Sequence, residues 1–210
     1  MSFPLRLEPG SSHAAGGNTI SRTRLEGVLS LRGPARTIVF LIGVILSLAL
    51  RSSAQNPSPT EYQIKAAFLY NFAKFVEWPT QAFAGPKSPI VIGVLGKNVF
   101  GDDLQNTIRD KTINNHPFQF KLFHSVEEAT NCHILFISAS EKDRLPKILD
   151  RLRDFSVLTV SETDHFTEAG GMINFVIEDN RVHFEINDIA AQKAGLKISS
   201  KLLSLATRNH

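Results

Sequence analysis

Apolar and polar residues follow two different periods along residues 59–210, and the changes of period mark the expected elements. Unbroken apolar runs at 89–95 and 133–137 predict two strands that are buried on both faces. A helical spacing of apolar residues leads up to Glu77. It is opened by Ser58-Pro59-Thr60-Glu61, which has the form of a capping box with proline in the first turn, so a largely buried helix is expected here.

The remaining segments alternate between strand and helix patterns. Strands are expected at 118–122 and 157–160, and strands at 172–177 and 182–186 flank a turn and predict a hairpin. Shorter helices are expected at 98–109, 126–130, 145–152, 188–195 and 199–207. This order predicts an α/β fold, a three-layer sandwich with a mostly parallel sheet and a C-terminal β-hairpin at its edge.

The first part of the chain has a different pattern. Arg32 and Arg36 precede the apolar run 37–50, and the small residues Ser52 and Ala54 follow it. This layout is typical of a secretory signal peptide, and the run is shorter than the roughly 20 residues that span a bilayer. We therefore expect 1–54 to be an N-terminal extension with a cleaved signal peptide and 55–210 to be one exported domain. An uncleaved anchor is the alternative.

The charge of the chain is concentrated in that presequence. Residues 1–54 carry six of the 23 basic and two of the 20 acidic side chains, which leaves 17 basic and 18 acidic residues in 55–210. The expected domain is thus almost neutral, and the basic character of the whole chain does not indicate nucleic-acid binding. Its single cysteine, Cys132, cannot form an internal disulfide. It is expected to be a small buried residue at a strand start, the alternative being an intermolecular bridge or a reactive thiol.

Few residues suggest catalysis. The sequence has no G-x-S-x-G, H-E-x-x-H, Walker or paired-cysteine motif. Ser161, Asp164 and His165 supply the residue types of a hydrolase triad, but an adjacent Asp and His cannot orient each other as a triad requires. Four histidines are considered as metal ligands: His116, His124, His133 and His183. Their spacings match no metal-binding pattern. We expect no catalytic residue, no metal and no cofactor.

Two segments remain as candidate binding sites. The turn after the strand 89–95 carries Gly96, Lys97 and Asn98, whose backbone amides and lysine could hold a small anion; the alternative is an ordinary strand-to-helix turn. The segment 166–175 places two glycines before the apolar hairpin. It is expected either to dock another protein or to be a tight turn that leads into a core hairpin.

Three segments together resemble the YfiR family of periplasmic proteins. They are Tyr62–Pro79, Val157–Phe175 and Val182–Leu203, and they occur in the order and at the separations typical of the family. The resemblance implies a small periplasmic α/β domain, often a homodimer, that regulates and is not an enzyme. It implies binding and inhibition of an inner-membrane diguanylate cyclase or a related sensor protein, and so control of cyclic di-GMP and biofilm formation.

The same resemblance assigns the partner-binding residues. These are Glu168, Met172 and Ile173 around Gly170-Gly171, with Trp78 as a second anchor. Family members with several cysteines could use internal disulfides, whereas this chain has one cysteine. The alternative function is a periplasmic small-ligand-binding module that feeds a membrane sensor, with its pocket at the turn 93–101.

Overall fold

The computed structural model describes residues 59–209, and every structural statement below refers to that part of the chain. The helices are α2 (Glu61–Phe75), α3 (Asp103–Ile108), α4 (Leu145–Leu152), α5 (Asp188–Lys193) and α6 (Ser200–Leu203), with short 3₁₀ turns η1 (Thr80–Ala82), η2 (Glu128–Asn131) and η3 (Ala139–Arg144). The strands are β1 (Val76–Glu77), β2 (Ile90–Leu95), β3 (Thr112–Ile113), β4 (His116–Phe123), β5 (Ile134–Ile137), β6 (Leu158–Ser161), β7 (Ile173–Glu178), β8 (Arg181–Ile186), β9 (Lys197–Ile198) and β10 (Arg208–Asn209).

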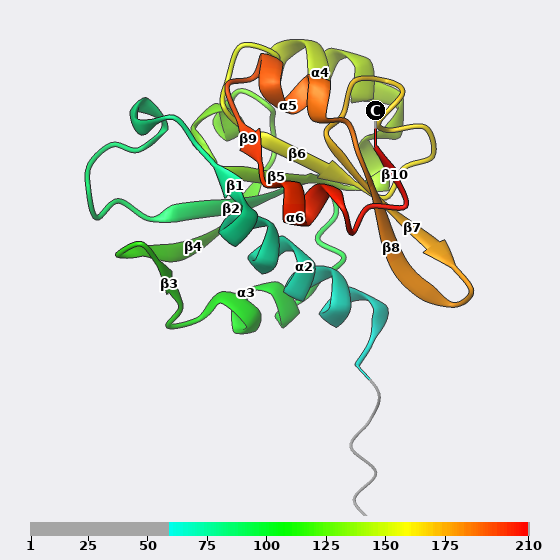
Figure 1. Ribbon diagram of the computed structural model, residues 1–210, viewed down its shortest axis with the longest axis horizontal. Coiled ribbons are helices and arrows are strands. Elements are labelled where there is room, and N and C mark those ends of the chain that lie inside the picture. Colours follow the sequence, from blue (N-terminus) through cyan, green and yellow to red (C-terminus); the bar gives the residue numbers. More distant parts are fainter. Residues whose placement is uncertain (1–58, 210) are drawn as a thin grey trace, which may run out of the picture. The chain divides into compact units, whose positions relative to one another are not determined.

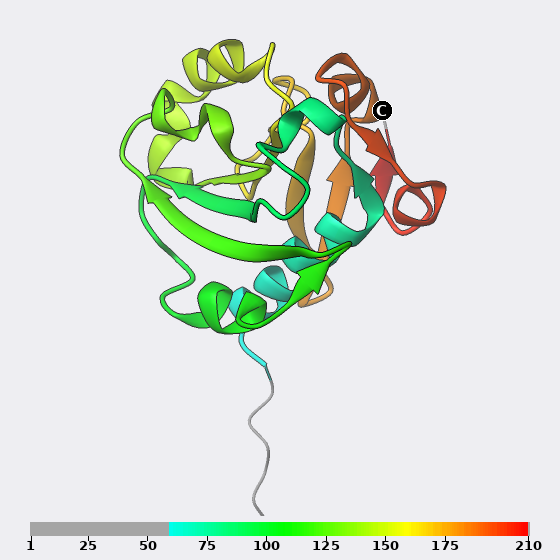
Figure 2. The ribbon, with the colours of Figure 1, turned by 90° about the vertical axis from the view of Figure 1, so that its left-hand side faces the viewer.

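One curled sheet organises the structure (Figure 1, Figure 2). Its strand order is β10-β8-β7-β6-β5-β2-β4-β3, and the strands from β7 to β4 in this order run parallel. The antiparallel pairs are the hairpin β7–β8 near one edge and β3–β4 at the other. The hairpin turn places Asp179 and Asn180 at positive φ, as a two-residue type I′ turn requires. The predicted α/β sandwich is therefore confirmed.

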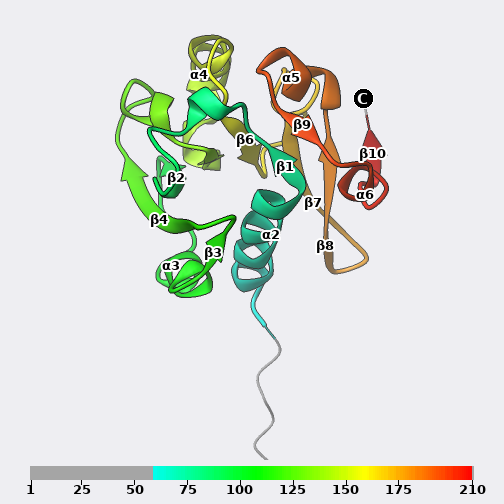
Figure 3. The same cartoon turned by 60° about the vertical axis from the view of Figure 1, so that its left-hand side comes forward.

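Helices cover both faces of the sheet (Figure 3). Each face has its own apolar core. Side chains of α2 and α3 pack with β2, β5, β6 and the hairpin in the larger core, where Leu69, Phe72 and Phe136 are fully buried. Helix α4 covers the opposite face with Leu145, Ile148 and Leu152. Among the described residues, no helix is long and apolar enough to cross a membrane.

Most elements lie where the apolar periods predict them, but their ends differ. Thr60, and not Ser58, caps α2: its hydroxyl accepts a hydrogen bond from the Gln63 amide while the Gln63 side chain accepts one from the Thr60 amide. Helix α2 ends at Phe75 because Val76 and Glu77 pair with β9. Residues 98–102 form turns before α3.

Some apolar side chains face away from the cores. Leu122 is 47% exposed, and its neighbour Phe123 is buried under the segment that contains η2. Ile177 near the hairpin turn is 51% exposed, and Leu205, which follows the short helix α6, is 60% exposed. The predicted signal peptide lies outside the described residues and stays a prediction.

Candidate functional site

The segment between β6 and β7, residues 162–172, carries the predicted docking residues, and we call it the β6–β7 loop. Its backbone is tied internally: the Gly171 amide donates to the Phe166 carbonyl at 2.9 Å and the Ala169 amide to the His165 carbonyl at 2.9 Å. The side-chain amide of Asn187 donates to the Thr167 carbonyl at 2.9 Å, which joins the loop to the start of α5. The loop is thus held on a rigid frame.

The structure divides the predicted docking residues into a buried and an exposed group. Ile173 is 0% and Met172 6% exposed, and Gly171 is also buried. Their side chains and backbone therefore belong to the core, which does not fit the prediction that they present themselves to a partner. Gly170 and Glu168 are exposed. A docking role for these two residues stays a prediction.

Glu168 lies in a group of surface charges. One of its carboxylate oxygens is 2.8 Å from Nδ1 of His165, and the other is 3.9 Å from the Arg208 guanidinium. Arg208 also contacts Glu185 at 3.2 Å. We call Glu168, His165, Arg208 and Glu185 the charged cluster. Because Glu168 is about half exposed, this cluster offers a carboxylate and a guanidinium to a polar partner surface.

Gly171 has a packing role. A Cβ atom at this position would lie 2.1 Å from the ring of Phe166, which is 0% exposed. We expect Gly171→Ala to lower the free energy of unfolding by about 1–3 kcal/mol through overpacking. Gly85→Ala is the control, since no atom lies within 4 Å of its Cβ position and its φ is not in the left-handed region. Urea unfolding of both variants checks this; an equal or smaller loss for Gly171→Ala would contradict it.

Trp78 is fixed against the core. Its indole Nε1–H donates to the His133 carbonyl at 3.1 Å, and the ring is partly buried against the larger core. Both its N–H group and part of its ring are therefore already in contact within the chain, and the residue is partly exposed. Its contribution to docking stays a prediction.

The turn after β2, the predicted site for a small ligand, is packed against the start of η3, and its ligand role stays a prediction. Gly96 has φ +88, and a Cβ there would lie 2.5 Å from the Ser140 hydroxyl. That hydroxyl accepts the Lys97 amide at 2.9 Å, and the Asn98 side chain accepts the Phe100 amide at 3.1 Å. The Lys97 amide is therefore already bound within the chain, and the α4–α5 cavity and three further cavities in the described residues are lined by residues other than Gly96, Lys97 and Asn98.

Ser161 and His165 have separate contacts within the fold. The hydroxyl of Ser161, buried, donates to the Ile137 carbonyl at 2.8 Å, whereas His165 is exposed and contacts Glu168. No group of three or more His, Cys, Asp and Glu side chains in residues 59–209 is arranged to hold a metal ion. Cys132 is 4% exposed just before β5, as predicted for a small buried residue, and burial raises the pKa of its thiol.

His133 occupies an unusual position under the segment that follows α2. Nδ1 accepts the Val91 amide at 3.0 Å, so the neutral ring carries its proton on Nε2, which has no hydrogen-bond partner among the described residues. The ring of Phe83 lies between the imidazoles of His133 and His116, with centroids at 4.6 and 4.3 Å. Burial, together with nearby His116, lowers the pKa of His133 to about 4. His133 is thus held neutral.

A buried lysine links α2 to the β6–β7 loop. Lys65 is 3% exposed, pairs with Glu61 one turn earlier, and lies 2.5 Å from Glu162. The Tyr62 hydroxyl also donates to Glu162 at 3.3 Å. The pair with Glu61 follows from the helical spacing, but Glu162 lies 97 residues away in sequence and no local pattern points to it. This ion-pair network anchors the first residue of the loop.

The comparison with protein families shows which family this chain belongs to. A family described as YfiR/HmsC-like matches residues 62–207. The chain belongs to the YfiR/HmsC-like family. YfiR-like proteins are periplasmic proteins with a general regulatory role in cyclic di-GMP signalling, and they are not enzymes.

Two further comparisons add less. No curated protein matches the sequence. Among solved structures, a conserved domain protein from Vibrio cholerae O1 biovar eltor superposes with a TM-score of 0.50 at 10% sequence identity, over 72% of this chain and 60% of that chain. At this identity the likeness concerns the fold alone. The YfiR-like chain therefore spans less than two thirds of that structure's length.

Proposed function

We propose that this YfiR-like protein binds the periplasmic region of an inner-membrane diguanylate cyclase, or of a related sensor protein, and holds it inactive. The family match over residues 62–207 is the observation that carries the proposal. Loss of the complex would raise cyclic di-GMP in the cytoplasm and favour biofilm formation. A homodimer, common in the family, is part of the proposal.

The exposed part of the β6–β7 loop is the surface that we assign to the partner. Gly170 and Glu168 are accessible there, and Glu168 belongs to the charged cluster with Arg208. The loop is held in place by Asn187 and, through Glu162, by Lys65. Because the loop is pre-organised, it loses little conformational entropy when a partner binds, and this favours affinity.

The coupling to cyclase activity needs only differential affinity. A repressor that binds the inactive conformation of the receptor better than the active one shifts the population toward the inactive state. A shift from mostly active to mostly inactive takes roughly 5 kcal/mol of differential binding. A few well-placed contacts are able to supply this free energy.

A pull-down tests the proposal. The protein, tagged after a flexible C-terminal spacer, is incubated with detergent-solubilised membranes, and bound proteins are identified by mass spectrometry. Recovery of a membrane protein with a cytoplasmic diguanylate cyclase domain supports the proposal. Recovery of no membrane protein by a folded bait, together with unchanged cyclic di-GMP after gene deletion, would contradict it.

Charge reversal tests the assigned surface. We expect Glu168→Lys to leave the unfolding free energy within about 0.5 kcal/mol of the wild type, since Glu168 is exposed, and to weaken capture of the receptor by tenfold or more. Asp102→Lys is the matched control, because Asp102 is exposed before α3 and its side chain does not cap that helix. Titration of the captured receptor with each variant gives the affinities. If Glu168→Lys and Asp102→Lys bound the receptor equally well, the interface would not include Glu168.

A further inference from the structure

A cleft between α4 and α5 is not explained by the fold or by the proposed function. We call it the α4–α5 cleft; its volume is about 390 Å³. The walls include Leu149 from α4 and Ile189 from α5, and Met172 and Leu152 lie deeper. Met172 is 6% and Leu152 2% exposed, whereas Ile189 is 57% exposed. The cleft thus has an apolar interior and an apolar side chain that water reaches.

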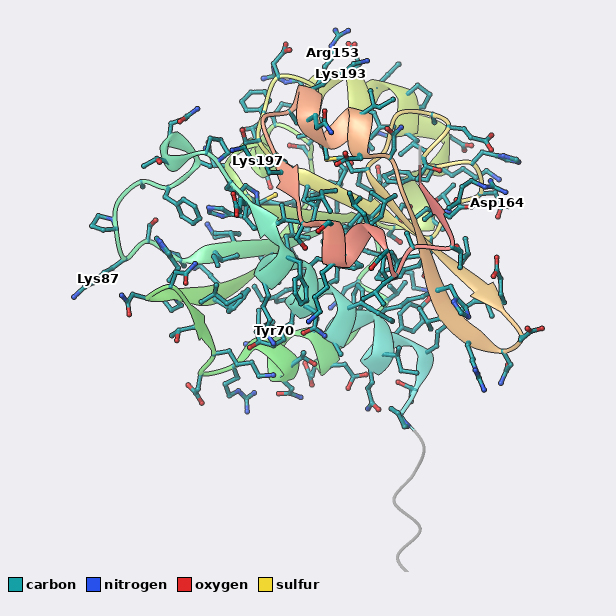
Figure 4. All side chains as sticks on the ribbon, viewed as in Figure 1. Tyr70, Lys87, Arg153, Asp164, Lys193 and Lys197 are labelled. Carbon is teal, nitrogen blue, oxygen red and sulfur yellow. The ribbon has the colours of Figure 1, made fainter. Side chains whose placement is uncertain are left out.

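Two cations stand at the rim of this cleft. Arg153 follows α4 and Lys193 ends α5, and both side chains lie at the same end of the molecule (Figure 4). Arg153 contacts Asp150 at 2.8 Å, whereas Lys193 makes no ion pair within residues 59–209. The rim therefore has a net positive charge, since Asp150 balances Arg153 and no carboxylate balances Lys193. This charge is complementary to an anion.

A buried hydroxyl in the lining has an uncommitted proton. Thr159 is 2% exposed, and its oxygen accepts the Met172 amide at 3.1 Å. In the described chain this hydroxyl donates to no other group, although a buried hydroxyl normally uses its proton. Thr159 is thus one of the few polar side chains in a largely apolar lining.

We propose that the α4–α5 cleft binds a small amphipathic carboxylate, with its apolar chain between Leu149 and Ile189 and its carboxylate near Lys193. The volume is within the range of small-molecule sites, and an apolar interior with few polar groups is their usual composition. The α4–α5 cleft is too small to hold a whole helix of a partner protein, because a helix requires a long groove. Ala169 and Gly170 also line the cleft, so an occupant would touch the β6–β7 loop. The site itself does not depend on the proposed function.

Methyl-resolved NMR of the purified protein tests this assignment, with octanoate as the probe and octylammonium as the probe of opposite charge. We expect octanoate to shift the methyl signals of Met172, Leu149 and Ile189 saturably, and octylammonium to shift them far less. Lys193→Glu should weaken octanoate binding by about fivefold or more, the effect of one partly screened ion pair. Lys147→Glu, on the exposed side of α4 outside the cleft, is the control and should bind octanoate as the wild type does.

Several results would overturn the assignment. They are the absence of saturable shifts at these methyl groups, equal binding of the two probes, or unchanged octanoate binding after Lys193→Glu. Ile189→Glu is a second variant that should keep its fold, since Ile189 is exposed, and lose octanoate. If octanoate does not bind but Ile189→Glu abolishes capture of the membrane receptor, the cleft docks a protein and the ligand assignment is wrong. Failure to capture any receptor would leave octanoate binding unaffected, so the two proposals fail separately.

Discussion

Replacement of Lys65 by methionine is expected to lower the free energy of unfolding by about 3–5 kcal/mol, because it leaves a carboxylate without its partner in a buried site. Lys65 is 3% exposed, and Glu162, at 14%, has lost most of its contact with water. Burial alone would lower the pKa of Lys65, but the hydrogen bonds that its ammonium donates to Glu162 and Glu61 raise it, so the folded protein holds the ammonium charged. Urea unfolding at neutral pH measures the loss.

Two further variants separate the buried charge from the lost side chain. Lys74→Met removes an exposed lysine from the same helix and should change the unfolding free energy by less than about 0.5 kcal/mol. The double variant Lys65→Met with Glu162→Gln should recover part of the loss, since the one carboxylate still left without its partner, Glu61, is about half exposed. A loss below about 1 kcal/mol for Lys65→Met alone would show that the network does not hold the loop.

The second large effect concerns acid. The unfolded chain binds a proton at His133 with a pKa near 6.5, whereas the folded chain does so at about 4. Between these values the unfolded state holds more protons, so the stability from neutral His133 is present above about pH 6.5 and is lost as the pH falls toward 4. The loss amounts to up to about 3 kcal/mol. Unfolding free energies measured at several pH values between 7 and 4 give the slope.

The substitution His133→Asn identifies the residue responsible. An asparagine oxygen can still accept the Val91 amide, but the side chain does not titrate. We expect a lower stability at pH 7, because the contact with Phe83 is lost, and a flatter dependence on pH. His124→Asn, at an exposed position, should keep the wild-type slope. An unchanged slope in His133→Asn would assign the acid sensitivity to the carboxylates.

Periodicity predicted the fold well because the strands β2 and β5 are continuous apolar runs, which are most stable at the centre of a sheet. It was less accurate at ends of elements, where single contacts decide. Thr60, and not Ser58, caps α2, and Phe123, which lies just beyond the strand expected at 118–122, is buried beneath the segment that contains η2. Such coverings depend on tertiary structure and leave no local signal.

The docking residues show the same limit. The family resemblance suggested that Ile173 contacts a partner, whereas this residue begins the hairpin strand β7 and is buried in the core. Glu162 and Arg208 were not found from the sequence, because each meets its partners across long separations. The cleft between α4 and α5 was missed for a related reason, since its walls come from two helices that are far apart along the chain.

The last strand, β10, has a consequence for self-association. It lies parallel to β8 with Arg208 opposite Glu185, and the Thr207 amide donates to the Phe184 carbonyl at 3.0 Å. These contacts occupy backbone groups of β8 that would otherwise be free to pair with a strand of another molecule. A chain cut before Thr207 would present β8, with Phe184 and Ile186 behind it, as a template for strand addition between copies. The C-terminal residues thus protect the sheet against aggregation while they supply Arg208 to the charged cluster.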